Sequence, residues 1–217
     1  MMGDYRTVIF DLDGTLLNTL EDLKDSVNEI LKQHGYSERS LSEIRSFVGN
    51  GAANLIRRAL PEGSSQEEIG NCLKEYSAYY FAHSRIKTCP YEGILNMLKE
   101  LKARGFCLAV VSNKGEDTVK DLCETYFPGY ISAAVGDMEG FQKKPAPDNV
   151  WRAMSECHAK RNDTLYVGDS EVDIETAKNC GLDSVLVSWG FREKELLKEH
   201  GAQHIIDSPL ELLEFLG

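Results

Sequence analysis

Hydrophobic and polar positions along this chain follow two patterns that alternate with each other. Short, continuous apolar runs rich in Val, Ile and Leu are typical of strands that are buried on both faces. We assign strands to residues 7–10, 108–111, 131–135, 165–167, 185–187 and 204–206. Longer amphipathic segments between them predict helices at residues 93–103, 116–126, 148–157, 173–180 and 193–200. This alternation predicts an α/β fold whose Rossmann-like parallel sheet is covered by helices on both faces.

The segment after the first strand lacks strand signals and has a helical period instead. Leu20, Leu23 and Val27 begin one helical pattern, a second surrounds Leu55, and residues 66–83 form a third. One face of that third helix carries Ile69, Leu73, Tyr76 and Tyr80. We therefore predict an α/β core with an inserted α-helical cap domain. The predicted core comprises residues 1–16 and 86–217, and the predicted cap comprises residues 17–85.

The charge balance of the 217 residues narrows the choice of partners. Lys and Arg number 24 against 35 Asp and Glu, which gives a net charge of −11. Such an excess repels nucleic acids and anionic membranes, so we expect neither as a partner. An anionic substrate would need local positive charge or a metal ion in its site. We expect a small metabolite as the ligand, and a monomer or weak homodimer.

The cysteines and histidines give no sign of a disulfide framework or a zinc site. The six cysteines include no C-x-x-C pair, which is typical of reduced thiols in a cytoplasmic protein. The five histidines share no metal-ligand spacing, so a zinc site is not expected. We find no signal-peptide pattern and no apolar run near the ~20 residues that span a membrane. The sequence therefore favours the cytoplasm.

Four polar clusters follow predicted strands or lie close beyond them, and the first is Asp11-Leu12-Asp13-Gly14-Thr15. Ligands of open parallel sheets bind at the carboxyl ends of the strands. Asp11 can attack phosphorus as a nucleophile, while Asp13 can protonate a leaving alkoxide and later deprotonate water. Thr15 is a candidate phosphate contact. Taken alone, the segment is also compatible with a solvated turn, because Asp and Gly favour turns.

The second cluster, Ser112-Asn113-Lys114, follows the strand at residues 108–111. The Ser112 hydroxyl, Asn113 and the backbone N–H groups here can hold phosphate oxygens, helped by the N-terminus of the next helix. On this segment alone, a simple helix cap at Ser112 is the favoured alternative.

The third cluster is the loop that contains Lys143 and Lys144 and continues through Pro145 and Pro147. The prolines restrict the loop and lead into a helix, which would hold a lysine in place. An ammonium group beside Asp11 would offset the repulsion between its carboxylate and a phosphate, and we assign this role to Lys144. Two solvated lysines in a turn are the alternative.

The fourth cluster runs from Gly168 to Asp173. Asp169 and Asp173 can lie on one side of a cavity, and with Asp11 they make an all-oxygen site that suits Mg²⁺. A capped helix with acidic residues at its start is the alternative, and both descriptions can hold. Together, the four clusters predict phosphoryl transfer in which Mg²⁺ and Lys144 compensate negative charge.

In type and order, these clusters resemble those of the haloacid dehalogenase superfamily over nearly the whole chain. The resemblance implies a helical cap inserted after the first motif of a Rossmann-like core. It implies Asp11 as nucleophile, Asp13 as general acid/base, Ser112 as phosphate binder and Lys144 as stabilising cation. The implied metal ligands are Asp11, the backbone carbonyl of Asp13, and Asp169, with Asp173 in support. Dehalogenases of the superfamily lack the second aspartate, so Asp13 indicates phosphate chemistry.

Within the superfamily, the chain resembles the phosphoglycolate phosphatase group in residues 47–51, residues 112–114 and the tail at 187–207. We expect Gly49, Asn50 and Gly51 to meet the non-phosphate end of the substrate, for example a carboxylate. A tight turn that starts a helix explains these residues equally well. Asn18 departs from the Asp that many relatives carry, and we expect it to affect hinge contacts rather than chemistry.

The leading function is therefore hydrolysis of a small phosphomonoester, with 2-phosphoglycolate as the first candidate substrate. Other small phosphates, such as sugar phosphates or pyrophosphate, stay open. A phosphomutase of the β-phosphoglucomutase type would use the same aspartyl-phosphate, although the glycine-rich cap segment argues against it. A non-catalytic binding protein is a third alternative, against which stands the presence of all the candidate catalytic groups.

Overall fold

The computed structural model of this protein describes residues 5–217, which separate into two compact units. One unit combines the segment that ends at Leu17 with Pro90–Gly217, and the other is Asn18–Cys89. The sequence had placed these boundaries at residues 16/17 and 85/86. At the two crossings the chain forms short strands that pair with each other, β2 (Leu17–Asn18) and β3 (Cys89–Pro90).

The first unit is built on a parallel sheet of six strands among the described residues, in the order β5-β4-β1-β6-β7-β8. The strands are β1 (Thr7–Phe10), β4 (Cys107–Gly115), β5 (Ala133–Asp137), β6 (Thr164–Gly168), β7 (Asp183–Val187) and β8 (Ile205–Ile206). Phe10 lies opposite Val110 on one side and Val167 on the other. The predicted α/β core is confirmed. β5 extends past the predicted apolar run because its last residue, Asp137, still pairs with β4.

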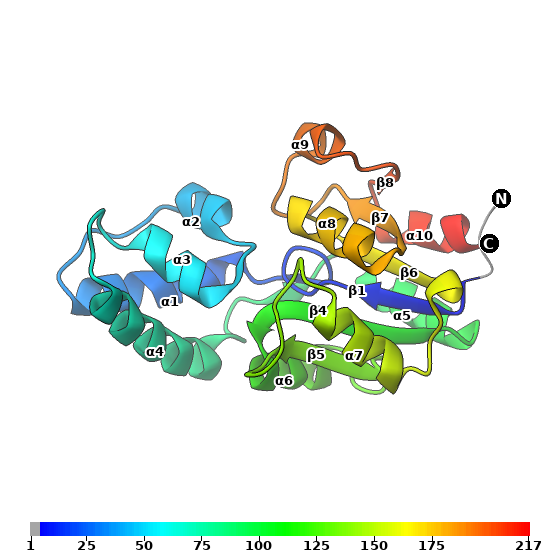
Figure 1. Ribbon diagram of the computed structural model, residues 1–217, viewed down its shortest axis with the longest axis horizontal. Coiled ribbons are helices and arrows are strands. Elements are labelled where there is room, and N and C mark those ends of the chain that lie inside the picture. The colour runs from blue at the N-terminus through cyan, green and yellow to red at the C-terminus, as the bar shows by residue number, and fades with distance from the viewer. Residues whose placement is uncertain (1–4) are drawn as a thin grey trace. The chain divides into compact units, whose positions relative to one another are not determined.

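Helices cover both faces of this sheet (Figure 1). One face carries α5 (Ile94–Ala103), α6 (Glu116–Tyr126) and α10 (Pro209–Leu216), and the other carries α7 (Asp148–Glu156) and α8 (Glu171–Cys180). A further helix, α9 (Lys194–Glu199), lies in the connection from β7 to β8. The sequence analysis did not predict α10, a short helix with Pro209 in its first turn, where proline is favoured.

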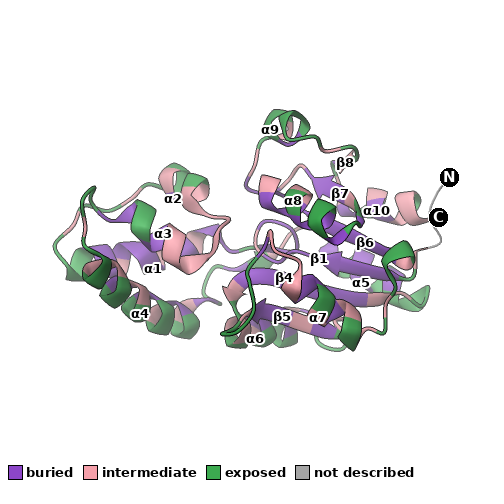
Figure 2. Cartoon of the chain, viewed as in Figure 1, coloured by how far each residue is buried: buried purple, intermediate pink, exposed green. Residues whose placement is uncertain are grey.

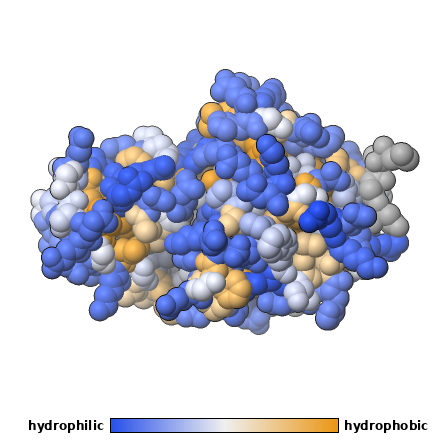
Figure 3. Space-filling view, in the orientation of Figure 1, coloured by the Kyte–Doolittle hydropathy of each residue, from blue (hydrophilic) through white to orange (hydrophobic). Residues whose placement is uncertain are grey.

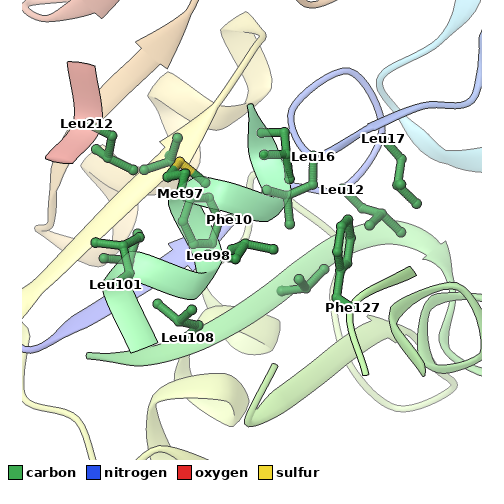
Figure 4. Packing of buried hydrophobic residues seen from close by; sticks show 14 of the residues in the cluster. Phe10, Leu12, Leu16, Leu17, Met97, Leu98, Leu101, Leu108, Phe127 and Leu212 are labelled. Atoms are coloured by element: carbon green, nitrogen blue, oxygen red, sulfur yellow. The ribbon is translucent and has the colours of Figure 1, made fainter. Parts of the chain in front are cut away.

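Side chains alternate along β1 between the two faces of the sheet. Val8 and Phe10 belong to the core under one layer of helices, while Ile9 belongs to the core under the other. In Figure 4, Phe10 lies among the side chains of α5, including Met97 and Leu98. Burial of one such side chain contributes about 1.5–3 kcal/mol. The strands form the buried centre of the unit (Figure 2), so the loops at their ends start from a fixed scaffold.

The second unit consists of helices α1 (Leu20–Gln33), α2 (Leu41–Phe47), α3 (Gly51–Ala59) and α4 (Gln66–His83). The sequence pattern did not reveal α2, because Ile44 is its single buried residue; a capping box between Ser40 and Glu43 marks its start. The buried residues of α4 are Cys72, Tyr76 and Tyr80. Ile69 and Leu73, which the prediction put on the same face, are half-buried.

The molecular face in Figure 3 is mostly hydrophilic, with small apolar areas between polar side chains. Within residues 5–217, every helix is too short or too polar to cross a membrane.

Asp22 in α1 anchors the segment that leaves the helical unit. Its buried carboxylate accepts hydrogen bonds from the backbone N–H groups of Ile86, Lys87 and Thr88, at distances from 2.8 to 3.1 Å. Hydrogen bonds to an ionised acceptor are stronger than neutral ones. This one side chain therefore satisfies three backbone donors at the end of the unit. The side chain of Asn18, at the other end, accepts a 3.4 Å hydrogen bond from the N–H group of Leu20, the first residue of α1.

We expect Asp22→Ala to lower the free energy of unfolding by about 2–4 kcal/mol, because three backbone donors lose their acceptor. Denaturant unfolding followed by circular dichroism measures the change. Asp25→Ala is the matched control, since the half-exposed Asp25 carboxylate pairs with Lys24 and Lys87 at the surface and is worth less than about 1 kcal/mol. Equal losses in the two variants would contradict the anchoring role of Asp22.

Candidate active site

The predicted site residues of the core gather at the carboxyl ends of the central strands. Asp11 and Asp13 follow β1, Ser112 lies near the end of β4, and Asp169 follows β6. Lys144 comes from the loop between β5 and α7. Because these strands are parallel neighbours, their ends bring the side chains to one edge of the sheet.

A tight turn positions the loop after β1. The Leu12 carbonyl accepts the N–H groups of Leu16 and Leu17, both at 3.0 Å, and Gly14 N–H donates to the Leu17 carbonyl at 2.9 Å. Leu12, Leu16 and Leu17 are fully buried in the core. The three buried leucines thus fix the position of the loop. Its two aspartates, Asp11 and Asp13, face the site.

The centre of the site is a buried lysine between two carboxylates. Lys144 Nζ lies 2.8 Å from Asp11 Oδ1, 2.8 Å from Asp173 Oδ1 and 3.1 Å from the Tyr166 hydroxyl. Only 5% of Lys144 is exposed. Burial lowers the pKa of its ammonium group, but Asp11 and Asp173 raise it by more, so the pKa stands well above its ordinary value. The two carboxylates therefore favour the charged form of Lys144.

Asn113 holds the lysine loop in place. Its side-chain N–H₂ donates to the Lys144 carbonyl at 3.0 Å, and its side-chain oxygen accepts the Lys144 N–H at 2.8 Å. Asn179 adds a bond of 2.9 Å to the Pro145 carbonyl. The structure thus adds a positioning role, which the sequence did not reveal, to the predicted phosphate contact of Asn113. Lys143 forms a separate ion pair at the surface.

Asp173 uses both carboxylate oxygens inside the protein. Oδ1 accepts from Lys144 and from the Tyr166 hydroxyl at 3.1 Å. Oδ2 accepts the N–H of Asp169 at 3.2 Å, and the N–H and hydroxyl of Ser170 at 3.1 and 2.7 Å. Ser170 is also the N-cap of α8 in a capping box with Asp173, so the helix cap and the site coexist. These contacts favour a supporting role for Asp173.

Two glycines allow the backbone to approach Asp169 closely. Asp169 is buried, and its Oδ2 accepts the N–H of Phe191 at 2.7 Å. A Cβ atom on Gly14 would lie 2.3 Å from Asp169 Oδ2, and one on Gly190 would lie 2.3 Å from Asp169 Cβ. Gly14 also has a φ of +86°, which favours glycine. The sequence analysis found Gly14 by its motif but did not single out Gly190.

Asp13 faces a second lysine. Its Oδ1 lies 3.2 Å from Lys114 Nζ, and its Oδ2 accepts a 3.4 Å hydrogen bond from Ser112. The side chains of Lys114 and Asp13 are only 9% and 14% exposed. Ser112 belongs to β4 and the N-cap of α6 is Gly115, so the alternative of a helix cap at Ser112 is wrong. Lys114 has no role in the sequence prediction, because its position in the motif does not reveal its partner.

Thr15 has apolar surroundings. Its buried hydroxyl has no hydrogen-bond partner among the described residues, and it lines a small gap with Phe10 and Met97. Its carbonyl accepts the Trp189 indole N–H at 3.0 Å. This location gives no support to the predicted phosphate contact of Thr15, which stays a prediction.

The predicted cap contacts Gly49, Asn50 and Gly51 lie in the helical unit, where Asn50 is the N-cap residue of α3. The Asn50 side chain makes no capping hydrogen bond to the helix. The expected turn that starts a helix is thus present, and substrate contact stays a prediction.

Asp11, Asp169 and Asp173 form a cluster that could hold a metal ion. One carboxylate oxygen of each lies within 4.8 Å of the others. When all are ionised, the carboxylates of these three residues and Asp13 carry four negative charges, whereas Lys114 and Lys144 supply two positive charges, which leaves two unbalanced. Hard oxygen donors with excess negative charge fit a divalent cation such as Mg²⁺. Asp11 and Asp169 are the best candidates for direct ligands, since Asp173 is engaged elsewhere.

Burial and the excess negative charge together shift the pKa values of carboxyl groups in the site. The pKa of Asp11 is raised to about 7, chiefly by burial and further by Asp173 and Asp13, against the opposing effect of Lys144. Burial, with Asp173 and Asp11, raises the pKa of Asp169 well above its ordinary value. A bound cation favours the ionised carboxylates, so metal and proton compete for this site.

The chain is similar to known proteins along most of its length. Residues 8–187 match the family model of haloacid dehalogenase-like hydrolases. A phosphoglycolate phosphatase of Aquifex aeolicus is 31% identical over 187 residues, or 86% of each chain. One of Vibrio parahaemolyticus is 32% identical over 221 residues, 99% of this chain and 97% of the relative. A crystal structure described as a candidate phosphoglycolate phosphatase, from Lactobacillus delbrueckii subsp. bulgaricus, is 35% identical, with a TM-score of 0.92 and 98% coverage of both chains.

We expect Asp11→Asn to stabilise the metal-free protein at pH 8. The pKa of Asp11 is raised from 3.8 to about 7 on folding, so this group's contribution to stability is complete below pH 3.8 and is lost as pH rises through 7. A neutral amide removes that loss, which is roughly 2–4 kcal/mol. Thermal unfolding with a chelator at pH 5 and pH 8 measures the difference, which should shrink at pH 5.

The control for this comparison is Asp117→Asn, an exposed substitution in the first turn of α6, which should change the stability by less than about 1 kcal/mol and equally at both pH values. A gain for Asp11→Asn that is the same at pH 5 and pH 8 would show that the ionisation of Asp11 is not its cause.

Proposed function

This chain belongs to the haloacid dehalogenase-like hydrolase family and is a phosphatase, and we propose that it hydrolyses a small phosphomonoester through an aspartyl-phosphate on Asp11. The single observation that carries the proposal is the buried contact of 2.8 Å between Asp11 and Lys144. A carboxylate held beside a fixed cation can receive a phosphate group, because the cation offsets the repulsion between them.

In the proposed first step, an Asp11 carboxylate oxygen attacks phosphorus. The bond between phosphorus and the ester oxygen breaks, and protonated Asp13 gives its proton to the leaving alkoxide. In the second step, Asp13 takes a proton from water, whose oxygen attacks the phosphorus of the aspartyl-phosphate. The bond to Asp11 breaks, inorganic phosphate leaves, and both aspartates return to their starting states.

The cations of the site support this chemistry. Lys144 stays next to Asp11 throughout, while Asn113, Tyr166 and Asp173 hold the lysine in position. Lys114 lies beside Asp13, where negative charge develops on the leaving oxygen. A Mg²⁺ ion held by Asp11, Asp169 and the backbone carbonyl of Asp13, with Asp173 in support, would supply further positive charge for the phosphoryl group.

We propose 2-phosphoglycolate as the substrate. The names of the relatives from Aquifex aeolicus and Vibrio parahaemolyticus support this choice. The Gly49-Asn50-Gly51 segment at the start of α3 has backbone N–H groups and an amide side chain that suit a carboxylate. Sugar phosphates and pyrophosphate are the alternative substrates, and transfer of the phosphate back to a sugar is the alternative reaction.

Phosphate release from 2-phosphoglycolate, sugar phosphates and pyrophosphate, with and without Mg²⁺, tests the proposed reaction. We expect release to need Mg²⁺, and Asp11→Asn to lower kcat/KM by at least about 1,000-fold, since it removes the nucleophile. Asp117→Asn is the control and should keep full activity. Acid-quenched wild-type protein should carry one phosphoryl group on the peptide that contains Asp11.

Two results would overturn this proposal. Full turnover by folded Asp11→Asn protein would refute the aspartyl-phosphate intermediate. Isomerisation of a sugar phosphate without net release of phosphate would identify the protein as a mutase.

Asn50→Ala tests the proposed recognition of the carboxylate. We expect the ratio of kcat/KM for 2-phosphoglycolate over that for a phosphomonoester with a neutral leaving group to fall roughly 10-fold, which is the loss of one hydrogen bond to a charged group. Asn71→Ala, on the exposed side of α4, should leave the ratio unchanged. An unchanged ratio in Asn50→Ala would show that Asn50 does not determine substrate choice, while the proposed reaction on Asp11 would still stand.

A further inference from the structure

A second group of metal-binding side chains lies in the helical unit, apart in sequence from the carboxylates of the core. His34, Cys72 and Glu75 each offer a donor atom, and these three atoms all lie within 4.8 Å of one another. We propose that these three residues bind one Zn²⁺ ion, with water as the fourth ligand.

Two helices bring these donors together. His34 directly follows the last residue of α1, and Cys72 and Glu75 are three residues apart in α4, which puts them on one face of that helix. The His34 ring stacks on Tyr36, with 6.3 Å between the ring centroids, and its Nε2 lies 2.6 Å from Glu75 Oε2. The site therefore belongs to a single compact unit.

The donor chemistry selects zinc over magnesium. An imidazole, a thiolate and a carboxylate are the ligands that Zn²⁺ takes, whereas Mg²⁺ prefers oxygen donors alone. Zinc sites that keep one position open have three protein ligands, with a water molecule in the fourth position. With Cys72 ionised and His34 neutral, the cluster carries two negative charges, which one Zn²⁺ ion balances.

The burial of the three residues suits a site that opens to solvent on one side. Cys72 is fully buried and forms the floor, while the side chains of His34 and Glu75 are 30% and 45% exposed and form the rim. Burial, helped by Glu75 and Glu68, raises the pKa of the Cys72 thiol, so the metal has to displace its proton.

The plain alternative is a hydrogen bond between His34 and Glu75 above a buried thiol that only packs the core. The two descriptions differ in one bond, because the proposed zinc site contains a bond between the metal and the Cys72 sulfur and the alternative has none. Cobalt makes this difference visible, since Co²⁺ bound to a thiolate absorbs strongly in the near ultraviolet and Co²⁺ bound to oxygen alone does not. The carboxylate cluster around Asp11 contains no sulfur and cannot give this signal.

The experiment titrates Co²⁺ into the full chain, reduced and freed of metal, with excess Mg²⁺ present to occupy the carboxylates of the core. We expect a sulfur-to-cobalt band that saturates at one equivalent and disappears when Zn²⁺ is added. Cys72→Ser and His34→Gln should each reduce the band at least 10-fold. Cys89→Ser is the matched control, because Cys89 is the exposed thiol of the same unit, and it should keep the full band.

The proposal would be overturned by the absence of a band in the wild type, by a full band in Cys72→Ser, or by loss of the band in Cys89→Ser. If Cys72→Ser folds poorly, His34→Gln still tests the site, because the His34 side chain is partly exposed and its replacement should not disturb the core. A folded His34→Gln protein with a full band would equally refute the site. None of these readouts depends on phosphatase activity.

Discussion

The contact on which the rest of the site depends is the ion pair between Lys144 and its two aspartates, Asp11 and Asp173. A buried ammonium group is costly unless it is paired, and a buried carboxylate is equally so. Here each compensates the other, at 2.8 Å on both sides. Much of the surrounding structure serves this arrangement: Asn113 fixes the lysine backbone, and Tyr166 bridges to Asp173. Loss of Lys144 would leave both aspartates without this counter-charge.

The sequence predicted the elements whose pattern depends on nearby residues. Continuous apolar runs located the central strands, and Asp11, Asp13, Asp169 and Lys144 were found because parallel strand ends meet at one edge. The sequence pattern did not reveal contacts between residues that are far apart along the chain. The pairing of Lys114, near the end of β4, with Asp13, after β1, joins positions far apart in the chain, and the neighbouring hydrogen bond from Ser112 to Asp13 spans 99 residues.

Elements with few buried residues escaped prediction for a related reason. Helix α2 buries Ile44 alone, so it leaves no apolar period to detect, although its capping box marks the start chemically. The expectation of no zinc site rests on histidine spacing, which describes ligands on a single element, and it stays a prediction. His34 and Cys72 come from separate helices, and only the packing of α1 against α4 brings them close. The family match locates the fold and the phosphatase chemistry, and it contributes nothing on such contacts.

The pairing of β2 with β3 affects how the chain can evolve. The chain leaves the core at Leu17 and returns at Pro90, and the two crossing strands are hydrogen-bonded neighbours. The two ends of the inserted segment are held next to each other by this pairing. A longer or shorter insertion therefore changes the entropy of loop closure only slightly. A different helical module could therefore replace residues 18–89 at this crossing without disturbing the sheet, so the inserted unit can evolve separately from the core.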